Sequence, residues 1–536
     1  MFQHAFLVLF IGCAHGEVVD TSKWLGAEYT PARASNTLWW WNFDEYEDDV
    51  LLELEAARRH FGYTTLRMFL HPLLYEADDV AFISNITRFV EIAETKDMRV
   101  GFVFFDDCFA HEGADLNEPC LPSRDPVQSG CEVGSFGQSQ CCMNCWVASP
   151  QDKDRDPSDV DRYRPYVTTI VSAFKNDPRV LWWEIFNEPN EASSFSLTLR
   201  SAAYSWAKAV HPTQPVISCW DDNDATDIID HHSYSGNFIE MSKATYSDPL
   251  KSAFITESGC RWYRTLDKDA GSPLNVVNWL NFLLEERKRR RSAVPFVPGV
   301  MFAWELMVGN VNTRFQWEDP AGLTPEPPIP WCGSLFPDGT PVSYTEAAII
   351  REYITLQMNT SHRASETKGA VTYVDTFLSK EQVLQNDQWL DLTASAARYT
   401  PPGVGPVQDA LLEVSLWPTS VVAGATVMLR ASVQDGEGCR GYNVTVSKSR
   451  IVVWRQNPER GGRVELGSVK IAARGGLFTN AWNLLRIHIE NSTVRVWLNP
   501  QYQDTKRVVD GRHFKTIRAM LSGNTAASTA SLVAAR

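Results

Sequence analysis

The sequence predicts a (β/α)8 barrel followed by an all-β domain. Between about residue 26 and residue 304, short runs of β-branched and aromatic residues alternate with stretches of helical periodicity, which is typical of parallel α/β folds. Eight such runs fall within about 280 residues, close to the usual length of a (β/α)8 barrel. After about residue 370, strand-like runs are separated by turn residues and long helical patterns are absent.

The barrel assignment depends on the predicted strands and on the helices between them. The eight predicted strands are Gly26–Tyr29, Thr64–Phe69, Val100–Phe105, Val180–Phe186, Gln214–Cys219, Asp227–His231, Ala253–Thr256 and Val300–Trp304. The predicted helices are Glu45–His60, Ile83–Thr95, Tyr163–Lys175, Ser196–Val210 and Leu274–Glu286. A doubly wound open sheet is the main alternative. No Gly-rich phosphate turn follows the first strand, so the nucleotide-binding version of that fold has no support.

The predicted domain boundaries follow changes in composition. An apolar stretch, Ala5–Ala14, is followed by small residues at cleavage-like spacing, which predicts a signal peptide and secretion. An uncleaved anchor is the alternative, but the stretch is too short to span a bilayer comfortably. The predicted segments are a signal peptide at 1–16, a barrel at 17–358 that closes with a helix, a polar linker at 359–372 and a β-sandwich at 373–536.

The six strands predicted for the C-terminal domain are bounded by Gly- or Asn-bearing turns. They are Ala410–Trp417, Thr426–Val433, Tyr442–Trp454, Arg463–Ile471, Leu485–Ile489 and Ser492–Leu498. This spacing is typical of a β-sandwich.

The composition excludes some classes of partner. A formal net charge of −15 argues against nucleic acid, whose binding needs a basic surface, and it disfavours a polyanionic substrate. No later segment is apolar for long enough to suggest a membrane span, and we expect a monomer. The 19 Trp residues modestly favour carbohydrate, because flat aromatic faces stack on sugar rings, although Trp is also a common core residue.

The chain contains 11 Cys residues, of which six lie between Cys108 and Cys145. The pair Cys142 and Cys145 has a spacing seen in zinc sites, but His111 is the only His nearby and an oxidising compartment favours disulfides. We therefore expect disulfides, whose connectivity the spacing leaves open, and no metal. Sequons at Asn85, Asn359, Asn443 and Asn491 are compatible with a secreted glycoprotein.

Two predicted strands run directly into a glutamate. The fourth ends at Asn187-Glu188-Pro189, and the seventh ends at Glu257. Hydrolysis of a glycosidic bond needs a proton donor and a second carboxylate, and barrel active sites lie at the C-terminal ends of strands. Capping or salt-bridged carboxylates are the alternative. Two such glutamates on strands three apart favour catalysis.

Several motifs around these glutamates form a pattern. They are Leu66-Arg67-Met68-Phe69, Phe186-Asn187-Glu188-Pro189, His232-Ser233-Tyr234 and Glu257, together with Trp39–Asn42, Val103–Asp106 and Pro337–Pro341. From about residue 26 to residue 352 the chain resembles glycoside hydrolase clan A, and within it family 5, which contains retaining β-glycanases of the cellulase, mannanase and xylanase type. The ordered Arg, Asn-Glu-Pro and second Glu are a specific signal, whereas His-x-Tyr alone is weak.

The resemblance implies a role for each matching position. Glu188 would be the general acid/base and Glu257 the nucleophile, while Asn187 would donate a hydrogen bond to the substrate 2-hydroxyl. Arg67 would keep Glu257 ionised and aimed. The remaining positions would be Tyr234 as a hydrogen-bond donor to Glu257, His232 beside it, and Trp304 as the platform under the sugar.

Other interpretations of these residues remain open. Arg67 could serve a buried ion pair, while His232 and Trp304 could be core residues. Trp220, after the fifth strand, could add a sugar-stacking surface or be an ordinary loop Trp.

Two further carboxylates could be mistaken for catalytic ones. Glu305 follows Trp304, and strand alternation predicts that it points away from the centre. Glu184 lies deeper in its strand, and we expect it to pair with a buried base.

The sequence therefore predicts a secreted retaining hydrolase of β-linked polysaccharide or oligosaccharide that needs no cofactor and no metal. A catalytically silent carbohydrate-binding or adhesion protein is one alternative, and a transglycosylase with the same site is another. The C-terminal domain weakly resembles concanavalin- or laminin-G-like sandwiches, some of which bind carbohydrate while many only pack against a catalytic domain.

Overall fold

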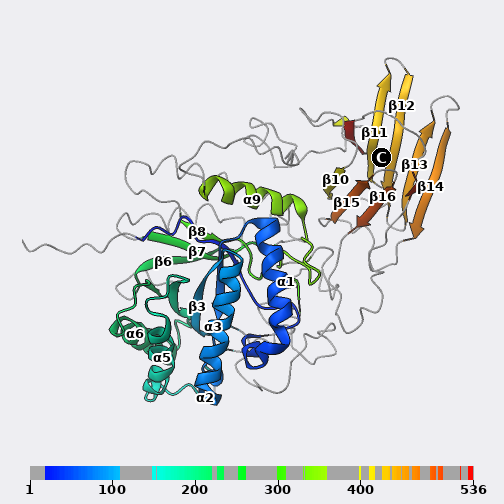
Figure 1. Ribbon diagram of the computed structural model, residues 1–536. Helices are drawn as coiled ribbons and strands as arrows, with labels where there is room; N and C mark the ends of the chain where they lie inside the picture. The colour runs from blue at the N-terminus through cyan, green and yellow to red at the C-terminus, as the bar shows by residue number, and fades with distance from the viewer. Residues whose placement is uncertain are drawn as a thin grey trace, which may run out of the picture.

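The computed structural model describes two parts of the chain (Figure 1). The first comprises residues 19–34, 36–108, 148–151, 154–219, 226–233, 252–260, 298–309, 330 and 332–358. The second comprises residues 398–399, 410–416, 425–434, 437–447, 450–457, 462–470, 483–490, 493–498, 519–520 and 529–534. The predicted signal peptide, linker and helix Leu274–Glu286 lie outside these residues, and the domain boundaries remain predictions.

The first part is built on a sheet of eight parallel strands. They are β1 (Leu25–Glu28), β2 (Thr65–Phe69), β3 (Arg99–Asp106), β4 (Val180–Asn187), β5 (Val216–Ile217), β6 (Ile228–Ser233), β7 (Ser252–Ser258) and β8 (Gly299–Met301). Their order is β5-β4-β3-β2-β1-β8-β7-β6. The amide of Asp227 donates a 2.9 Å hydrogen bond to Val216 O, which joins the two ends of this order. The predicted (β/α)8 barrel is confirmed.

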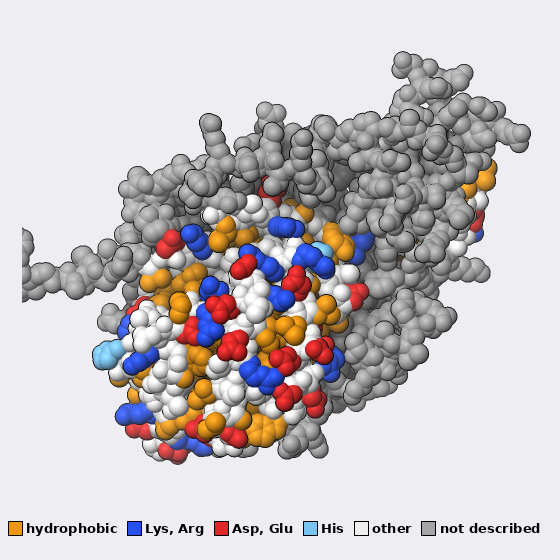
Figure 2. Space-filling view, in the orientation of Figure 1, with side chains coloured by type: hydrophobic (Ala, Val, Ile, Leu, Met, Phe, Trp, Pro, Cys, Tyr) orange, Lys and Arg blue, Asp and Glu red, His pale blue; other side chains and the backbone are white. Residues whose placement is uncertain are grey.

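Helices follow most of the strands and cover the outside of the sheet (Figure 1). They are η1 (Thr37–Asn42), α1 (Phe43–Phe61), α2 (Pro72–Ala77), α3 (Asp79–Thr95), η3 (Val160–Tyr163), α5 (Arg164–Phe174), α6 (Ser194–Ala209) and α9 (Tyr344–Met358). On the outer face of these helices, acidic and basic side chains alternate rather than gather by sign (Figure 2).

In helix α1, the local sequence determines both the buried face of the helix and the residue at which it ends. Val50, Leu54, Ala57 and Phe61 recur at helical spacing and are buried. The helix stops at Gly62, whose φ of 76° is a left-handed conformation that favours glycine.

The inside of the barrel is filled by large side chains at the N-terminal ends of the strands. The ring of Trp182 lies 4.8 Å from Phe254 and 5.3 Å from Trp24, measured between ring centroids. Gly101 on β3 makes room for it, because a Cβ there would lie 2.0 Å from Trp182 Cε2. Two residues further along β4, Glu184 takes the same inward side by strand alternation. The inside of the barrel is thus filled with aromatic side chains toward the N-terminal ends of the strands and with polar side chains toward their C-terminal ends.

The second part contains two antiparallel sheets, which confirms the predicted all-β architecture. One sheet has the order β10 (Ala410–Leu416), β15 (Asn483–Glu490), β16 (Thr493–Leu498) and β17 (Ala519–Met520). The other has the order β14 (Gly462–Lys470), β13 (Arg450–Asn457), β12 (Glu437–Val446), β11 (Ala425–Gln434), β18 (Thr529–Ala534) and β9 (Arg398–Tyr399). The guanidinium of Arg486 on β15 donates to Pro341 O and Val342 O, at 2.9 and 2.8 Å, and so ties this part to the barrel.

One predicted strand in this part is wrong. Tyr442–Trp454 is two strands, β12 and β13, joined where Ser447 N donates to Arg450 O. Apolar alternation continues on both sides of the turn, and Ser447-Lys448-Ser449 lacks the Gly, Pro or Asn that marks a turn in sequence.

Within the described residues, no helix combines the length and the apolar composition that crossing a bilayer requires.

Candidate active site

The candidate site lies where several barrel strands end. Glu257 is in β7, His232 is in β6, Arg67 is in β2, and Glu188 follows β4 directly. Because all eight strands are parallel, these ends share one rim of the barrel.

The backbone at Glu188 adopts a conformation that is rare for its residue type. Its φ is +43°, in the left-handed region that non-glycine residues seldom enter. The chain leaves β4 here and meets Pro189 at once. Such strain is found mainly where a side chain must be presented in a particular direction. The turn aims the Glu188 carboxylate toward the neighbouring strand ends.

His232 joins the two predicted catalytic glutamates. Its Nδ1 lies 2.7 Å from Glu188 Oε1 and 3.1 Å from Glu257 Oε2, and the three contacting atoms lie within 4.8 Å of one another. Glu257 and His232 are almost wholly buried, whereas the Glu188 side chain is 25% exposed. The two glutamates predicted from strands three apart therefore lie close together on either side of His232.

Arg67 is a fully buried cation of the site. It donates to Glu257 Oε1 at 2.7 Å, to Glu184 Oε2 at 2.8 Å and to Asn187 Oδ1 at 2.7 Å, and it also contacts Glu28. The expected pairing of Glu184 with a buried base is confirmed. Arg67 contacts Glu257, as the catalytic interpretation expects, and it also forms a buried ion pair with Glu184, as the structural interpretation expects. The two interpretations are therefore compatible.

One guanidinium faces three carboxylates in this buried cluster, and burial opposes their charge. Burial raises the pKa of Glu184 to about 7, although Arg67 pulls it down. Burial likewise raises the pKa of Glu28 well above its usual value. The cluster can therefore hold protons near neutral pH while Arg67 is shared with Glu257.

The amide of Asn187 is fixed from two sides. Its Oδ1 accepts from Arg67, and its Nδ2 donates to Asp106 Oδ1 at 2.9 Å. These contacts determine which end of the amide carries the donors. Nδ2 also lies 3.7 Å from Cys108 Sγ, next to Glu188.

The ionisation of His232 reflects its neighbours. Burial alone lowers the pKa of His232, but Cys219, Glu257 and Glu188 beside the ring outweigh it and place the pKa well above its usual value. The ring therefore favours the protonated form next to the two carboxylates.

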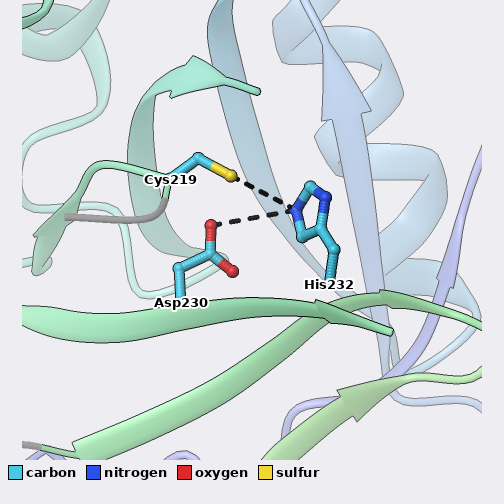
Figure 3. Close-up of side chains that lie close together, drawn as sticks. All are labelled: Cys219, Asp230 and His232. Carbon is cyan, nitrogen blue, oxygen red and sulfur yellow. Dashed lines mark hydrogen bonds and ion pairs between the residues drawn. The ribbon is translucent and has the colours of Figure 1, made fainter. Parts of the chain in front are cut away.

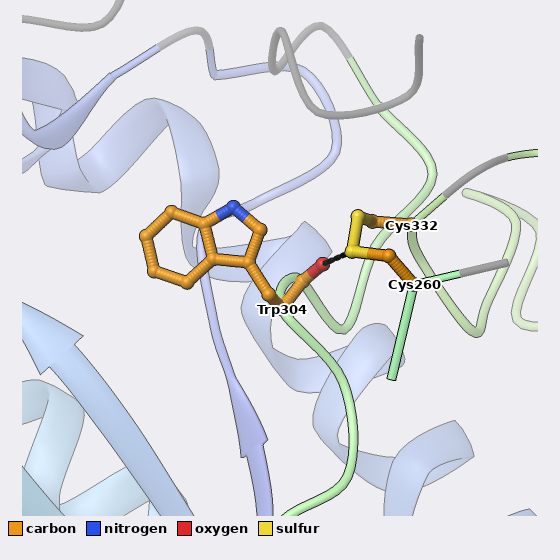
Figure 4. Close-up of a disulfide and its surroundings, with 3 residues drawn as sticks. All are labelled: Cys260, Trp304 and Cys332. Atoms are coloured by element: carbon orange, nitrogen blue, oxygen red, sulfur yellow. Dashed lines mark hydrogen bonds between the residues drawn. A yellow bond between two sulfur atoms is a disulfide. The ribbon is translucent and has the colours of Figure 1, made fainter. Parts of the chain in front are cut away.

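Trp304 follows β8 and packs at the same rim. Its amide donates to Ser258 O at 2.9 Å, and its ring meets Phe69 edge to face at 5.5 Å. A disulfide between Cys260 and Cys332 lies beside it, with Cys260 Sγ 3.7 Å from Trp304 O (Figure 4). The ring is almost entirely buried, and its role as a sugar platform remains a prediction.

Glu305 is held by another part of the structure. It accepts hydrogen bonds from the side chain and backbone of Thr30, just after β1, and burial raises its pKa to about 8. That Glu305 points away from the centre of the barrel, and is not the nucleophile, remains a prediction.

Some predicted features differ or cannot be placed. Trp220 and Tyr234 lie outside the described residues. The disulfide expectation holds for Cys260 and Cys332 but is wrong for Cys108 and Cys219, which are free thiols. The sulfur of each free thiol contacts a polar group of the site: Cys108 Sγ lies 2.9 Å from Glu188 Oε2, and Cys219 Sγ lies 3.5 Å from His232 Nε2.

Sequence reasoning missed several members of the site. They are Glu28, Asp106, Cys108, Cys219 and Asp230. Each lies at or next to the end of a barrel strand, or two residues before a predicted site residue on the same strand. The strand-end criterion that selected the two glutamates would have found all of these except Asp230 if it had been applied to every strand.

The fold and the site together define a (β/α)8-barrel protein with paired glutamates at the C-terminal ends of β4 and β7. The chain is similar to solved structures of glycoside hydrolases. One is a GH5_18 protein from Streptomyces cattleya in complex with GlcNAc, at 13% identity and a TM-score of 0.41, covering 64% of this chain and 82% of that one. Another is an endo-β-1,4-mannanase from Thermotoga petrophila, at 11% identity and a TM-score of 0.37, covering 84% and 97%.

An exo-β-1,4-mannosidase from Opitutaceae bacterium strain TAV5 is also similar, at 14% identity and a TM-score of 0.42, covering 64% of this chain and 63% of that one. No family model matches the chain, and no curated protein matches it. Likenesses this low do not indicate a substrate, so the function must be inferred from the side chains of the barrel.

Proposed function

We propose that this chain is a secreted retaining β-glycoside hydrolase in which Glu188 is the acid/base and Glu257 the nucleophile. One observation carries the proposal: carboxylate oxygens of Glu188 and Glu257 lie within 4.8 Å of one another around His232. Retaining enzymes hold their two carboxyl groups about 5–5.5 Å apart, whereas inverting enzymes need about 6.5–9.5 Å to admit a water molecule.

Glu257 has the surroundings of a nucleophile. Arg67 donates to its Oε1 and His232 contacts its Oε2, so two cationic groups stabilise the carboxylate in a site that water hardly reaches. A desolvated carboxylate held in this way can attack the anomeric carbon. The bond to the leaving oxygen breaks as the glycosyl-enzyme bond forms.

Glu188 has the surroundings of a proton carrier. Its side chain is the more exposed of the pair and can meet both the leaving oxygen and the incoming water. His232 and the Cys108 thiol contact one carboxylate oxygen each. Glu188 protonates the leaving oxygen in the first step and takes a proton from water in the second.

Asn187 supports the proposal because its amide is positioned to contact the substrate. Arg67 and Asp106 fix the orientation of its amide, and in the proposed reaction this amide donates to the sugar 2-hydroxyl. A hydrogen bond to this hydroxyl strengthens as the oxocarbenium-like transition state forms.

Secretion is part of the proposal. It is supported by the apolar N-terminal stretch and by the disulfide between Cys260 and Cys332, a bond that persists in oxidising compartments.

The decisive experiment measures stereochemistry and covalent catalysis together. The purified chain is screened on cellulose, mannan, xylan and aryl β-glycosides, and the first-formed anomer is recorded by NMR. We expect the β-anomer. With azide as an external nucleophile, Glu257→Ala should yield the α-glycosyl azide and Glu188→Ala the β-glycosyl azide. Glu91→Gln, an exposed position on α3, is the matched control and should behave as the wild type.

Different results identify the alternatives. An initial α-anomer from a β-linked substrate contradicts the proposal, as does full activity in Glu257→Ala. Oligosaccharide binding by calorimetry without turnover of any glycoside would identify a binding protein. Products longer than the substrate would identify a transglycosylase that uses the same two glutamates.

A further inference from the structure

A second polar cluster lies behind His232, on the side away from the glutamates. Asp230 and His232 are two residues apart on β6, so they share a face of the strand, and Cys219 follows β5. The Cys219 sulfur and the Asp230 carboxylate converge on the same ring nitrogen of His232 (Figure 3).

The distances place three potential ligand atoms around one point. His232 Nε2 lies 3.5 Å from Cys219 Sγ and 4.0 Å from Asp230 Oδ2, and all three atoms lie within 4.8 Å of one another. All three residues are buried. The set combines a thiol, an imidazole and a carboxylate.

One atom of this cluster lacks a hydrogen bond. Asp230 Oδ1 accepts from the Thr256 hydroxyl, but Oδ2 has no hydrogen-bond partner among the described residues, although the side chain is fully buried. A buried carboxylate oxygen without a hydrogen bond is unfavourable, because it has given up its water and gained no partner in return. The oxygen is aimed at the space beside His232 Nε2.

The cluster is not arranged as a nucleophilic triad. In such a triad the nucleophile and the carboxylate occupy opposite nitrogens of the imidazole. Here Cys219 and Asp230 approach the same nitrogen, and Glu188 and Glu257 occupy the other. Cys219 is also completely buried, so no substrate reaches its sulfur.

We propose that Cys219, Asp230 and His232 form a binding site for a divalent cation of the Zn²⁺ class. Thiolate, imidazole and carboxylate are the ligands that Zn²⁺ takes in proteins. Tetrahedral Zn²⁺ with ordinary bond lengths places its ligand atoms about 3.3–3.6 Å apart. The distance from Sγ to Nε2 already fits, and the 4.0 Å distance from Nε2 to Oδ2 needs to shorten by about 0.4–0.7 Å.

Charge favours this ligand set in a buried position. A dication with one thiolate, one carboxylate and one neutral imidazole has no net charge, so burying it avoids the penalty for an isolated ion. The cation displaces the thiol proton of Cys219 and the Nε2 proton of the protonated His232 ring, and both protons leave to solvent. It also takes the lone pair of His232 Nε2, so the remaining ring proton stays on Nδ1, facing Glu188 and Glu257.

The other grouping of possible ligands around His232 is already engaged. Glu188, His232 and Glu257 also lie within reach of a common ion, but Arg67 binds one oxygen of Glu257 and Cys108 contacts one oxygen of Glu188. The cluster of Cys219, Asp230 and His232, in which Asp230 Oδ2 lacks a hydrogen bond, is therefore the better site. This inference does not depend on the proposed glycosidase activity.

Cobalt(II) tests the site, because a Co²⁺–thiolate bond absorbs in the near ultraviolet whereas Co²⁺ bound by oxygen and nitrogen alone does not. The full-length chain, purified with chelator and then freed of it, is titrated with Co²⁺. We expect a thiolate-to-cobalt band that saturates at one equivalent and disappears when Zn²⁺ is added. Cys219→Ser should abolish the band, and Asp230→Asn should weaken Co²⁺ binding at least tenfold.

Cys108→Ser is the matched control, because it removes the other free thiol of the site and should keep the band. Circular dichroism establishes that each variant is folded, and Asp230→Asn, which preserves shape, serves as the test if Cys219→Ser does not fold. Absence of the band in the wild type overturns the proposal. So does a band of undiminished intensity in Cys219→Ser, or Co²⁺ affinity unchanged in Asp230→Asn.

Discussion

Nη1 of Arg67 lies 2.7 Å from Oε1 of Glu257, and both side chains are almost completely removed from solvent. The same guanidinium also contacts Glu184 and Glu28, so one cation stabilises several buried carboxylates. Removing a buried charge leaves its partners unpaired, which costs more than the pair contributes by itself. The stability of the barrel and the orientation of the proposed nucleophile are therefore linked through Arg67.

Arg67→Lys should damage stability and activity together. A lysine ammonium cannot reproduce the forked hydrogen bonds to Glu184, Glu257 and Asn187. We expect a loss of about 3–5 kcal/mol in the free energy of unfolding. We also expect kcat/KM on an aryl glycoside to fall at least about 100-fold, as for a misplaced reacting group.

Urea denaturation and steady-state kinetics measure the two effects. Arg164→Lys is the control, because Arg164 and Asp161 form an exposed ion pair, and its stability should stay within about 0.5 kcal/mol of the wild type. Wild-type stability in Arg67→Lys would show that the buried ion pairs do not hold the barrel together.

Glu53 should make the protein less stable as pH rises. Burial raises its pKa to about 8 from an unfolded value near 4.5, although Tyr29 and Ala32 donate hydrogen bonds to it. Its contribution is fully present below the unfolded pKa and is lost as pH rises through the folded pKa. The stability of Glu53→Gln relative to the wild type should therefore increase between pH 5 and pH 8 by up to about 1.4 kcal/mol per pH unit.

Urea denaturation of both proteins at several pH values checks this. The matched control is Glu55→Gln on the same helix, whose pKa is lowered by its hydrogen bond to Lys96. That contribution is lost only as pH falls through the lowered value, so its difference from the wild type should be flat from pH 5 to pH 8. A flat difference for Glu53→Gln as well would mean that Glu53 is ionised in the folded protein.

Gly259, two residues after Glu257, should not tolerate a side chain. Its φ is +97°, and a Cβ there would lie 1.8 Å from the carbonyl oxygen of Phe302. Gly259→Ala must push β7 and the chain after β8 apart, so we expect a loss of about 3–5 kcal/mol, typical of severe backbone conflict, and a large fall in kcat/KM. Gly62→Ala also has a positive φ but meets nothing closer than 3.5 Å, and it should cost only about 1–2 kcal/mol. Equal Tm values for the two variants would contradict the steric argument.

Cys108 should make activity sensitive to thiol reagents at alkaline pH. Burial and the Glu188 carboxylate raise the pKa of the Cys108 thiol well above its usual value. Because the thiolate is the reactive form, modification should be slow at neutral pH and faster as pH rises. An adduct on Sγ would displace Glu188, which lies 2.9 Å away, so turnover should be lost as the mass of the adduct appears.

Residual activity against time with methyl methanethiosulfonate, at pH 7 and pH 9, measures this effect. Cys108→Ser should retain whatever activity it has throughout the treatment. Inactivation of Cys108→Ser at the wild-type rate would assign the sensitivity to another cysteine.

Much of the barrel could be predicted because its elements are set by local chemistry. β4 is an unbroken apolar and aromatic run from Val180, and α1 has buried residues at helical spacing and ends at Gly62. The turn between β12 and β13 could not be predicted, because the pairing of two strands across it, and not a turn residue, defines it.

Part of the candidate site could likewise be predicted from the sequence, and part could not. The amino-acid order by itself determined that Glu188 and Glu257 end strands of a parallel barrel, because strand ends are visible as breaks in apolar runs. Only the tertiary structure decided that His232 stands between them, that Arg67 is shared with Glu184 and Glu28, and that Cys108 and Cys219 remain free thiols beside the site. These relationships join residues from different strands. The spacing of residues along the sequence does not show which side chains come within hydrogen-bond distance when the barrel closes.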